Sequence, residues 1–121
     1  MDGGKVMRHL ESDIQIACVR WFRYQHPKLA RLLFAVPNGG ARNAVTASIL
    51  KAEGVVAGVA DLLLLIPKKG YAYLAIEMKK VGGRVSDSQK AFQQAVERFK
   101  GKYVVCYSLE EFQAVVTEYL E

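Results

Sequence analysis

Two neighbouring strand-like segments, both apolar on their two faces, constrain the fold of this chain most strongly. One runs from Val59 to Ile66, the other from Tyr71 to Lys79, and a polar turn at 67–70 separates them. A strand that is apolar on both faces needs helices on both sides of its sheet, because either face would otherwise lie in water. The short turn joins the two strands as a hairpin. The pattern therefore predicts a hairpin at the centre of a layered fold.

The remaining segments supply helices and outer strands. Apolar residues at helical spacing predict helices over 11–25, 42–53 and 109–120, and a further helix that begins at a capping box on Ser86 and extends to Phe99. Short apolar runs predict strands over 32–36 and 102–107. The order is α-β-α-β-β-α-β-α. We therefore expect an α/β fold with a small mixed β-sheet flanked by helices. Because domains usually hold about 100–150 residues, we expect one domain over 1–121.

The charge is unevenly distributed along the chain. Residues 1–51 carry eight basic and three acidic side chains, whereas residues 52–121 carry nine of each, and the net charge is +5. A small protein with a basic region of this kind suits binding to phosphates. Charge by itself leaves open whether the partner is a nucleic acid.

Several features point to a cytoplasmic protein. No apolar run reaches the roughly 18 residues that a membrane span needs, and no apolar N-terminal segment is present to act as a secretory signal. The two cysteines, Cys18 and Cys106, lack CxxC spacing and fall in apolar patterns, so we expect reduced core residues. The sequence therefore predicts no membrane partner.

Three charged residues interrupt the two apolar strands. Glu77 and Lys79 are two positions apart and share one face of the second strand. A five-residue loop over 67–71 sets a register in which Asp61 lies opposite Glu77. A slip of one residue would place the two carboxylates on opposite faces of the sheet. The clustering of Asp61, Glu77 and Lys79 is thus a prediction about register.

Such a cluster has a specific chemical use. Two opposed carboxylates repel each other unless a cation lies between them, and hard oxygen ligands suit Mg²⁺ or Mn²⁺. A lysine beside such an ion can hold a water molecule or neutralise charge on a transition state. A cross-strand charge network without catalysis remains an alternative.

Two helices place further polar side chains towards the same pocket. Glu11 and Gln15 lie along the apolar side of the first helix, and Gln89 lies at the sheet-facing start of the third. Each has a structural alternative: Glu11 favours the helix N-terminus, and Gln89 completes a capping box with Ser86.

These residues form an ordered set. It consists of Glu11-x-x-x-Gln15, Asn38-Gly39-Gly40 with Arg42, Gly54 followed by Gly58-Val59-Ala60-Asp61, Glu77-Met78-Lys79, and Ser86-x-x-Gln89. In this order the set resembles the virus-type replication-repair nuclease (VRR-NUC) family of the PD-(D/E)xK nuclease superfamily. Ala60 stands where the family usually has a proline, which supplies no ligand. The resemblance implies a restriction-endonuclease-like core.

The resemblance also implies a metal site and a catalytic group. Asp61 and Glu77 would be metal ligands, the backbone carbonyl of Met78 a third contact, and Glu11 a further acidic group, bound directly or through water. Lys79 would be the catalytic lysine. The other implied residues are Gln89, on the water or the scissile phosphate, and a DNA-side set of Asn38, Gly39, Gly40, Arg42 and Gln15. A plain tight turn at 38–40 is the alternative for that loop.

The implied activity is Mg²⁺- or Mn²⁺-dependent hydrolysis of DNA phosphodiester bonds. Small free-standing members resemble phage and bacterial resolvases that cut branched DNA, so we expect four-way (Holliday) junctions or flaps as substrates in a bacterial or phage-infected cell. A four-way junction has two-fold symmetry, so we also expect a homodimer. The alternatives are a non-catalytic nucleic-acid-binding module and an interaction protein whose polar cluster is only structural.

Overall fold

The chain folds into a mixed four-stranded sheet between two layers of helices. The computed structural model describes residues 10–37 and 43–121. The sheet has the order β1-β2-β3-β4, and only the β3–β4 pair is parallel. The elements are α2 (Leu10–Gln25), η1 (Pro27–Leu32), β1 (Leu33–Ala35), α3 (Ala44–Ala52), β2 (Leu62–Leu64), β3 (Leu74–Met78), α4 (Asp87–Arg98), β4 (Lys102–Cys106) and α5 (Leu109–Leu120). The predicted α/β class is confirmed.

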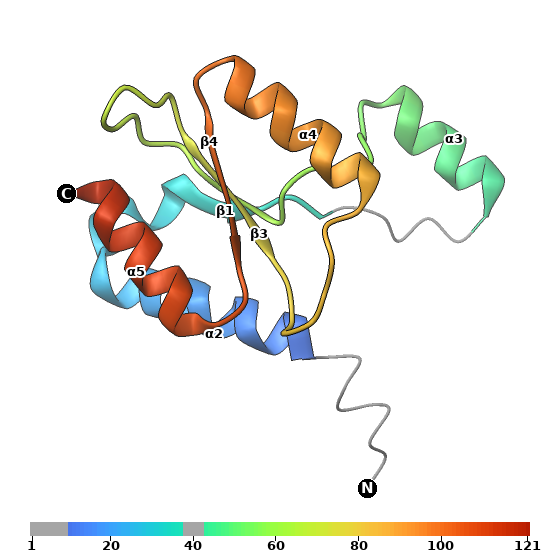
Figure 1. Ribbon diagram of the computed structural model, residues 1–121. Coiled ribbons are helices and arrows are strands. Elements are labelled where there is room, and N and C mark those ends of the chain that lie inside the picture. The colour runs from blue at the N-terminus through green and yellow to red at the C-terminus, as the bar shows by residue number, and fades with distance from the viewer. Residues whose placement is uncertain (1–9, 38–42) are drawn as a thin grey trace, which may run out of the picture.

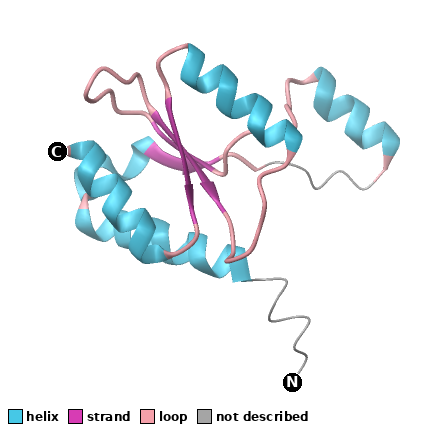
Figure 2. Ribbon diagram, in the orientation of Figure 1, coloured by secondary structure: helices cyan, strands magenta, loops and turns pink. Residues whose placement is uncertain are grey.

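Helices cover both faces of the sheet, as the doubly apolar strands require. Helices α2 and α5 lie on one face and α4 on the other (Figures 1 and 2). The α2/α5 face holds the larger core, which includes Phe22, Phe112, Leu62 and Ile76. Within the described residues, no helix is long and apolar enough to cross a membrane.

The central hairpin has the register on which the site prediction depends. Leu62 lies opposite Ile76 and Leu64 opposite Leu74. One position further along the same register, Asp61 lies beside Glu77. Strand β2 is shorter than the apolar run predicts. At its start the Asp61 carboxylate, and not a backbone carbonyl, accepts the Met78 N–H at 2.7 Å.

A glycine joins the segment before β2 to helix α4. Gly58 has a φ of +87°, and a Cβ atom built on it would lie 2.4 Å from the carbonyl carbon and oxygen of Ser88. Only glycine allows both this conformation and this approach. The chain that leads to Asp61 is therefore held directly against the first turn of α4.

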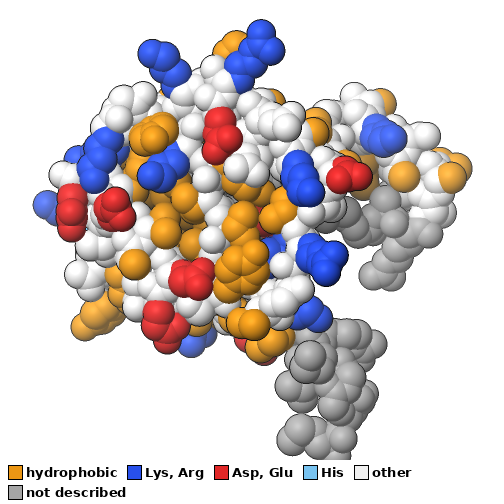
Figure 3. Space-filling model, viewed as in Figure 1, with side chains coloured by type: hydrophobic (Ala, Val, Ile, Leu, Met, Phe, Trp, Pro, Cys, Tyr) orange, Lys and Arg blue, Asp and Glu red, His pale blue; other side chains and the backbone are white. Residues whose placement is uncertain are grey.

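Helix α3 stands away from the sheet. Figure 1 shows it to the right of the body, and in Figure 3 it forms a lobe with hydrophobic side chains on its surface. None of its residues is buried, and Val45 and Ile49 are 70% and 54% exposed. The Asn43 side chain caps the helix by accepting the Thr46 N–H at 2.8 Å.

One predicted apolar stripe is shorter than its spacing suggests. On α4, Val96 is buried and Phe92 packs against the core of that face. Phe99 is 73% exposed, because the helix ends at Arg98 and Phe99 is its C-cap residue.

Candidate active site

Glu77 lies at the centre of a polar cluster on the α4 face of the sheet. Strand β3 positions it, and the side chain is only 3% exposed. Its Oε2 atom accepts a hydrogen bond from Gln89 Nε2 at 2.7 Å. The Lys79 ammonium group lies 3.7 Å from the same oxygen and is itself largely buried. Residues from β3 and α4 therefore converge on one carboxylate.

Gln89 contacts the cluster and caps its helix at the same time. Its side-chain oxygen accepts the Ser86 N–H at 2.8 Å, and Ser86 Oγ accepts the Gln89 N–H at 3.2 Å. The amide nitrogen remains free to donate to Glu77. Gln89 can therefore both cap its helix and contact the cluster, because one side-chain amide supplies an acceptor oxygen and a donor nitrogen.

Asp61 is fixed between the two neighbouring strands. Its carboxylate accepts the Met78 N–H, and its backbone carbonyl accepts the Val36 N–H at 2.9 Å. The side chain is half-buried beside Glu77. The Met78 side chain is buried on the opposite face, so its backbone is the part that faces Asp61.

The two carboxyl groups are close enough to change each other's protonation. The pKa of Glu77 is raised to about 8, first by burial and next by the negative charge of Asp61. The Lys79 charge opposes the shift, while a hydrogen bond to Asp61 and the charge of Glu11 add to it. When both carboxyls are ionised neither can donate, and the buried Oε1 atom of Glu77 has no hydrogen-bond partner among the described residues. The pair therefore either shares a proton or needs a cation.

The donor set fits a hard divalent cation. Two adjacent carboxylates and an unsatisfied buried oxygen are the environment in which Mg²⁺ or Mn²⁺ replaces a shared proton. Along 10–37 and 43–121, no three His, Cys, Asp or Glu side chains form a group that could hold a metal ion. Asp61 and Glu77 are therefore a two-carboxylate set, which suits Mg²⁺ because that ion usually keeps several waters.

Helix α2 carries the other two predicted residues, of which Glu11 lies close enough to act on Glu77. Glu11 and Gln15 are both half-buried in its first turns. The Glu11 charge acts on Glu77, although it is the weakest of the causes of the pKa shift. Gln15 lines a groove along α2. The predicted loop residues Asn38, Gly39, Gly40 and Arg42 lie outside the described residues.

The cysteines belong to the core, as predicted. Cys18 and Cys106 are free and fully buried. Burial raises the pKa of the Cys18 thiol to about 12 and that of Cys106 to about 11, which keeps both protonated at neutral pH.

The sheet and the carboxylate–lysine cluster at its edge define a nuclease-type fold of the PD-(D/E)xK kind. A family model described as the VRR-NUC domain matches residues 8–110, so the chain belongs to the VRR-NUC family. A solved structure named "VRR_NUC domain protein" has the same fold, with a TM-score of 0.80, 24% sequence identity, and coverage of 91% of this chain and 87% of that one. No curated protein matches the chain. Membership of the family associates the chain with nuclease function, DNA and a divalent metal ion.

Proposed function

We propose that this protein is a Mg²⁺- or Mn²⁺-dependent DNA endonuclease that hydrolyses phosphodiester bonds in branched DNA such as four-way junctions or flaps. One observation carries the proposal. Asp61, Glu77, Lys79 and Gln89 come together in a cluster in which the buried Oε1 atom of Glu77 has no donor among the described residues. Such an arrangement is costly for stability and is typical of a catalytic site. The family's association with nucleases agrees with it.

The metal would be held by few protein groups. Asp61 and Glu77 would be its direct ligands, with the Met78 backbone carbonyl as a third contact and Glu11 acting through water. When bound, the ion would supply Lewis-acid stabilisation of the charge on the phosphate being cut. Binding would also satisfy Glu77 Oε1, which explains why a buried oxygen without a donor is tolerated.

Lys79 and Gln89 would act on the reacting groups. Lys79 already lies beside Glu77 as an ammonium ion, so it would neutralise negative charge that develops on the phosphate as water attacks phosphorus and the P–O bond breaks. Gln89 would orient the attacking water or the scissile phosphate through its amide. The capping box holds this amide in place before substrate binds. Gln15, Asn38, Gly39, Gly40 and Arg42 would contact the DNA.

The quaternary state belongs to the same proposal. A homodimer would present two sites to the two-fold symmetry of a junction. Helix α3 offers a surface for the second copy, because it exposes Val45 and Ile49 and has Lys51 as its only charged residue. We expect sedimentation to show a dimer that Val45→Glu with Ile49→Glu converts to a monomer. A monomer before substitution would refute this part. We place the protein in the cytoplasm of a bacterial or phage-infected cell.

The direct test is cleavage of a substrate panel. Four-way junction, flap, splayed and linear duplex DNA are incubated with Mg²⁺, with Mn²⁺ or with EDTA. We expect metal-dependent cutting of the branched forms. Lys79→Ala should lower the cleavage rate by at least about 100-fold, while its DNA affinity in EDTA stays near that of the unmodified protein. Lys80→Ala is the matched control and should cut normally.

Two results would overturn the catalytic assignment. One is full cleavage by Lys79→Ala. The other is an absence of Mn²⁺ uptake in calorimetric titration of the unmodified protein, which would favour the non-catalytic DNA-binding module. Asp61→Asn with Glu77→Gln gives the metal-free reference for that titration.

A further inference from the structure

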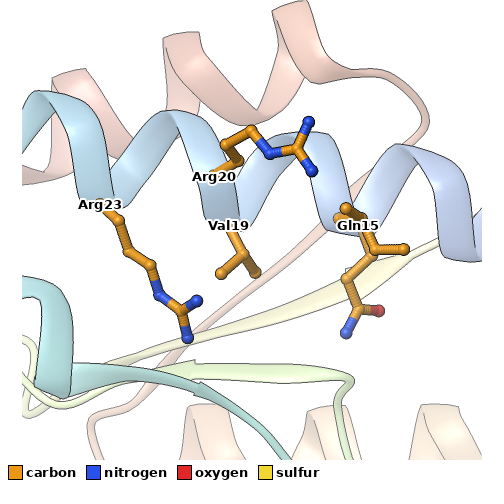
Figure 4. A pocket seen from close by; sticks show the side chains of 5 residues that line it. Gln15, Val19, Arg20 and Arg23 are labelled. Atoms are coloured by element: carbon orange, nitrogen blue, oxygen red, sulfur yellow. The ribbon is translucent and has the colours of Figure 1, made fainter.

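A groove runs along helix α2 beside the active site. It has a volume of about 330 Å³ and is lined by Gln15, Ile16, Val19, Arg20 and Arg23. In Figure 4 the Gln15, Val19 and Arg23 side chains point from α2 towards the strands below it. The groove therefore includes Gln15, which the sequence predicts to contact DNA, and continues along α2 to Arg23.

Three of the groove residues, Ile16, Arg20 and Arg23, are exposed, whereas Val19 is half-buried and packs against the larger core. Ile16, Val19, Arg20 and Arg23 follow the spacing i, i+3, i+4 and i+7, so they lie on one stripe. Cys18 and Phe22 lie on the stripe that packs against the sheet. Ile16 is 54% exposed although it is apolar. Ile16, Arg20 and Arg23 are thus not needed to pack the helix against the sheet.

The two arginines have no ion-pair partner in the part of the chain that the structure describes. Across 10–37 and 43–121 the one ion pair within 4.0 Å is Lys79–Glu77, so neither Arg20 nor Arg23 is paired with a described carboxylate. Guanidinium groups bind phosphate oxygens in a planar, two-pronged geometry. The apolar side chains of the groove, Ile16 and Val19, match the sugar edge of a nucleic-acid backbone better than a small free anion. The positive charge of the arginines and the apolar surface of the groove together suit a phosphodiester chain.

The length of the groove fits several nucleotides. Gln15 and Arg23 are eight residues apart, which is about 12 Å along a helix axis. Phosphates of one DNA strand advance by about 3.4 Å per base step along the duplex axis, so the groove spans three to four steps. Gln15 lies one turn from Glu11, whose charge acts on Glu77. A strand in the groove would therefore be continuous with one in the active site.

We propose that the α2 groove binds the sugar-phosphate backbone of the DNA strand where it leaves the active site, with Arg20 and Arg23 each contacting one phosphate. The inference rests on the proposed nuclease function and adds a binding surface to it. The groove would also set which phosphate is cut, because it fixes the distance from the bound phosphates to the scissile one.

Salt-dependent binding tests the groove without catalysis. The affinity for duplex DNA is measured in EDTA over a series of salt concentrations, for the unmodified protein and for Arg20→Gln with Arg23→Gln. Loss of two phosphate contacts should make the slope of log K against log salt shallower by about 1.8 and lower the affinity at least about tenfold. Lys68→Gln with Arg98→Gln removes the same charge at the opposite end of the sheet and should change neither quantity to this extent.

Two further variants separate binding from folding. Arg20→Lys with Arg23→Lys keeps the charge at the end of α2 and should retain most of the salt slope, with a partial loss of affinity. Ile16→Glu places a carboxylate in the groove at an exposed position and should weaken DNA binding while the thermal unfolding midpoint stays unchanged.

The outcomes distinguish the groove from the nuclease. If the Arg20→Gln, Arg23→Gln protein binds with the unmodified affinity and slope but cuts DNA with Mg²⁺, the groove assignment is wrong and the nuclease function stands. The same holds if Ile16→Glu binds DNA normally. If the unmodified protein neither binds DNA in EDTA nor cuts it with metal, the proposed function itself fails.

Discussion

The two faces of the sheet have different compositions, although the same strands form both. The α2/α5 face is an apolar core of large side chains, including Phe22, Phe112 and Leu62. The α4 face has a small cluster of buried apolar residues, Ala60, Ala75, Val96 and Tyr103, and next to it the buried Glu77. Successive residues of β3 therefore point alternately into the apolar core on the α2/α5 face and towards the polar cluster on the α4 face. The comparison shows how a small protein can tolerate a buried carboxylate oxygen that has no hydrogen-bond donor among the described residues. The apolar core on the other face of the sheet supplies the stability.

The largest expected effect is a loss of stability when a side chain of the apolar face is shortened. Phe22→Ala should lower the free energy of unfolding by about 3–5 kcal/mol, because it leaves a cavity in the core. Urea unfolding measures it. Tyr24→Ala is the control on the same helix, since Tyr24 is 85% exposed and should change stability by less than about 0.5 kcal/mol. Equal effects of the two substitutions would mean that the α2/α5 face is not the stabilising layer.

The pH dependence of stability should come from the α4 face. The pKa of Glu77 is about 8 in the folded protein and about 4.5 when unfolded, so between these values the folded state holds more protons. Stability of the metal-free protein should therefore fall as pH rises from 5 to 8, by about 3 kcal/mol. Glu77→Gln should remove most of this fall and be more stable than the unmodified protein at pH 8. A rise in stability over this range would contradict the assignment.

A smaller effect is expected at Gly58, where the segment before β2 meets the first turn of α4. Gly58→Ala should destabilise the protein by about 2 kcal/mol and reduce cleavage, because the new methyl group meets the backbone of Ser88 and displaces Gln89. Gly70→Ala is a matched control: its φ is +86°, but its Cβ would meet nothing within 4 Å. It should show only the strain of the positive φ and normal cleavage. Normal cleavage by Gly58→Ala would show that this contact does not position the site.

The smallest effect concerns two tyrosines on opposite faces. The buried Tyr103 hydroxyl has no partner among the described residues, so Tyr103→Phe should be neutral or stabilise by up to about 1 kcal/mol. The Tyr119 hydroxyl donates to the Ile66 carbonyl at 2.6 Å, so Tyr119→Phe should cost about 1 kcal/mol. Thermal unfolding of both variants measures the difference. A loss on Tyr103→Phe as large as that on Tyr119→Phe would reveal a hidden partner of Tyr103.

Much of the architecture follows from local patterns in the sequence. The helix predicted over 109–120 matches α5, and the one over 11–25 matches α2 within a residue. The hairpin register was predictable because its short polar turn leaves few ways to pair two apolar strands. The convergence of Asp61 and Glu77 follows from that register.

Other features depend on contacts between distant segments. No local pattern predicts that Gly58 touches Ser88, or that Met78 donates its N–H to a side chain. The stripe of Arg20 and Arg23 is visible in the sequence, but its exposure depends on which face of α2 packs on the sheet.

The double role of Gln89 links fraying of α4 to the proposed catalytic site. The first turn of α4 is held by the same side chain that contacts Glu77, so opening of that turn releases both at once. Amide hydrogens of this turn should exchange faster than those of β3, and warming should abolish activity before the sheet melts. The heat sensitivity of the proposed activity would then be set by one helical turn and not by the core.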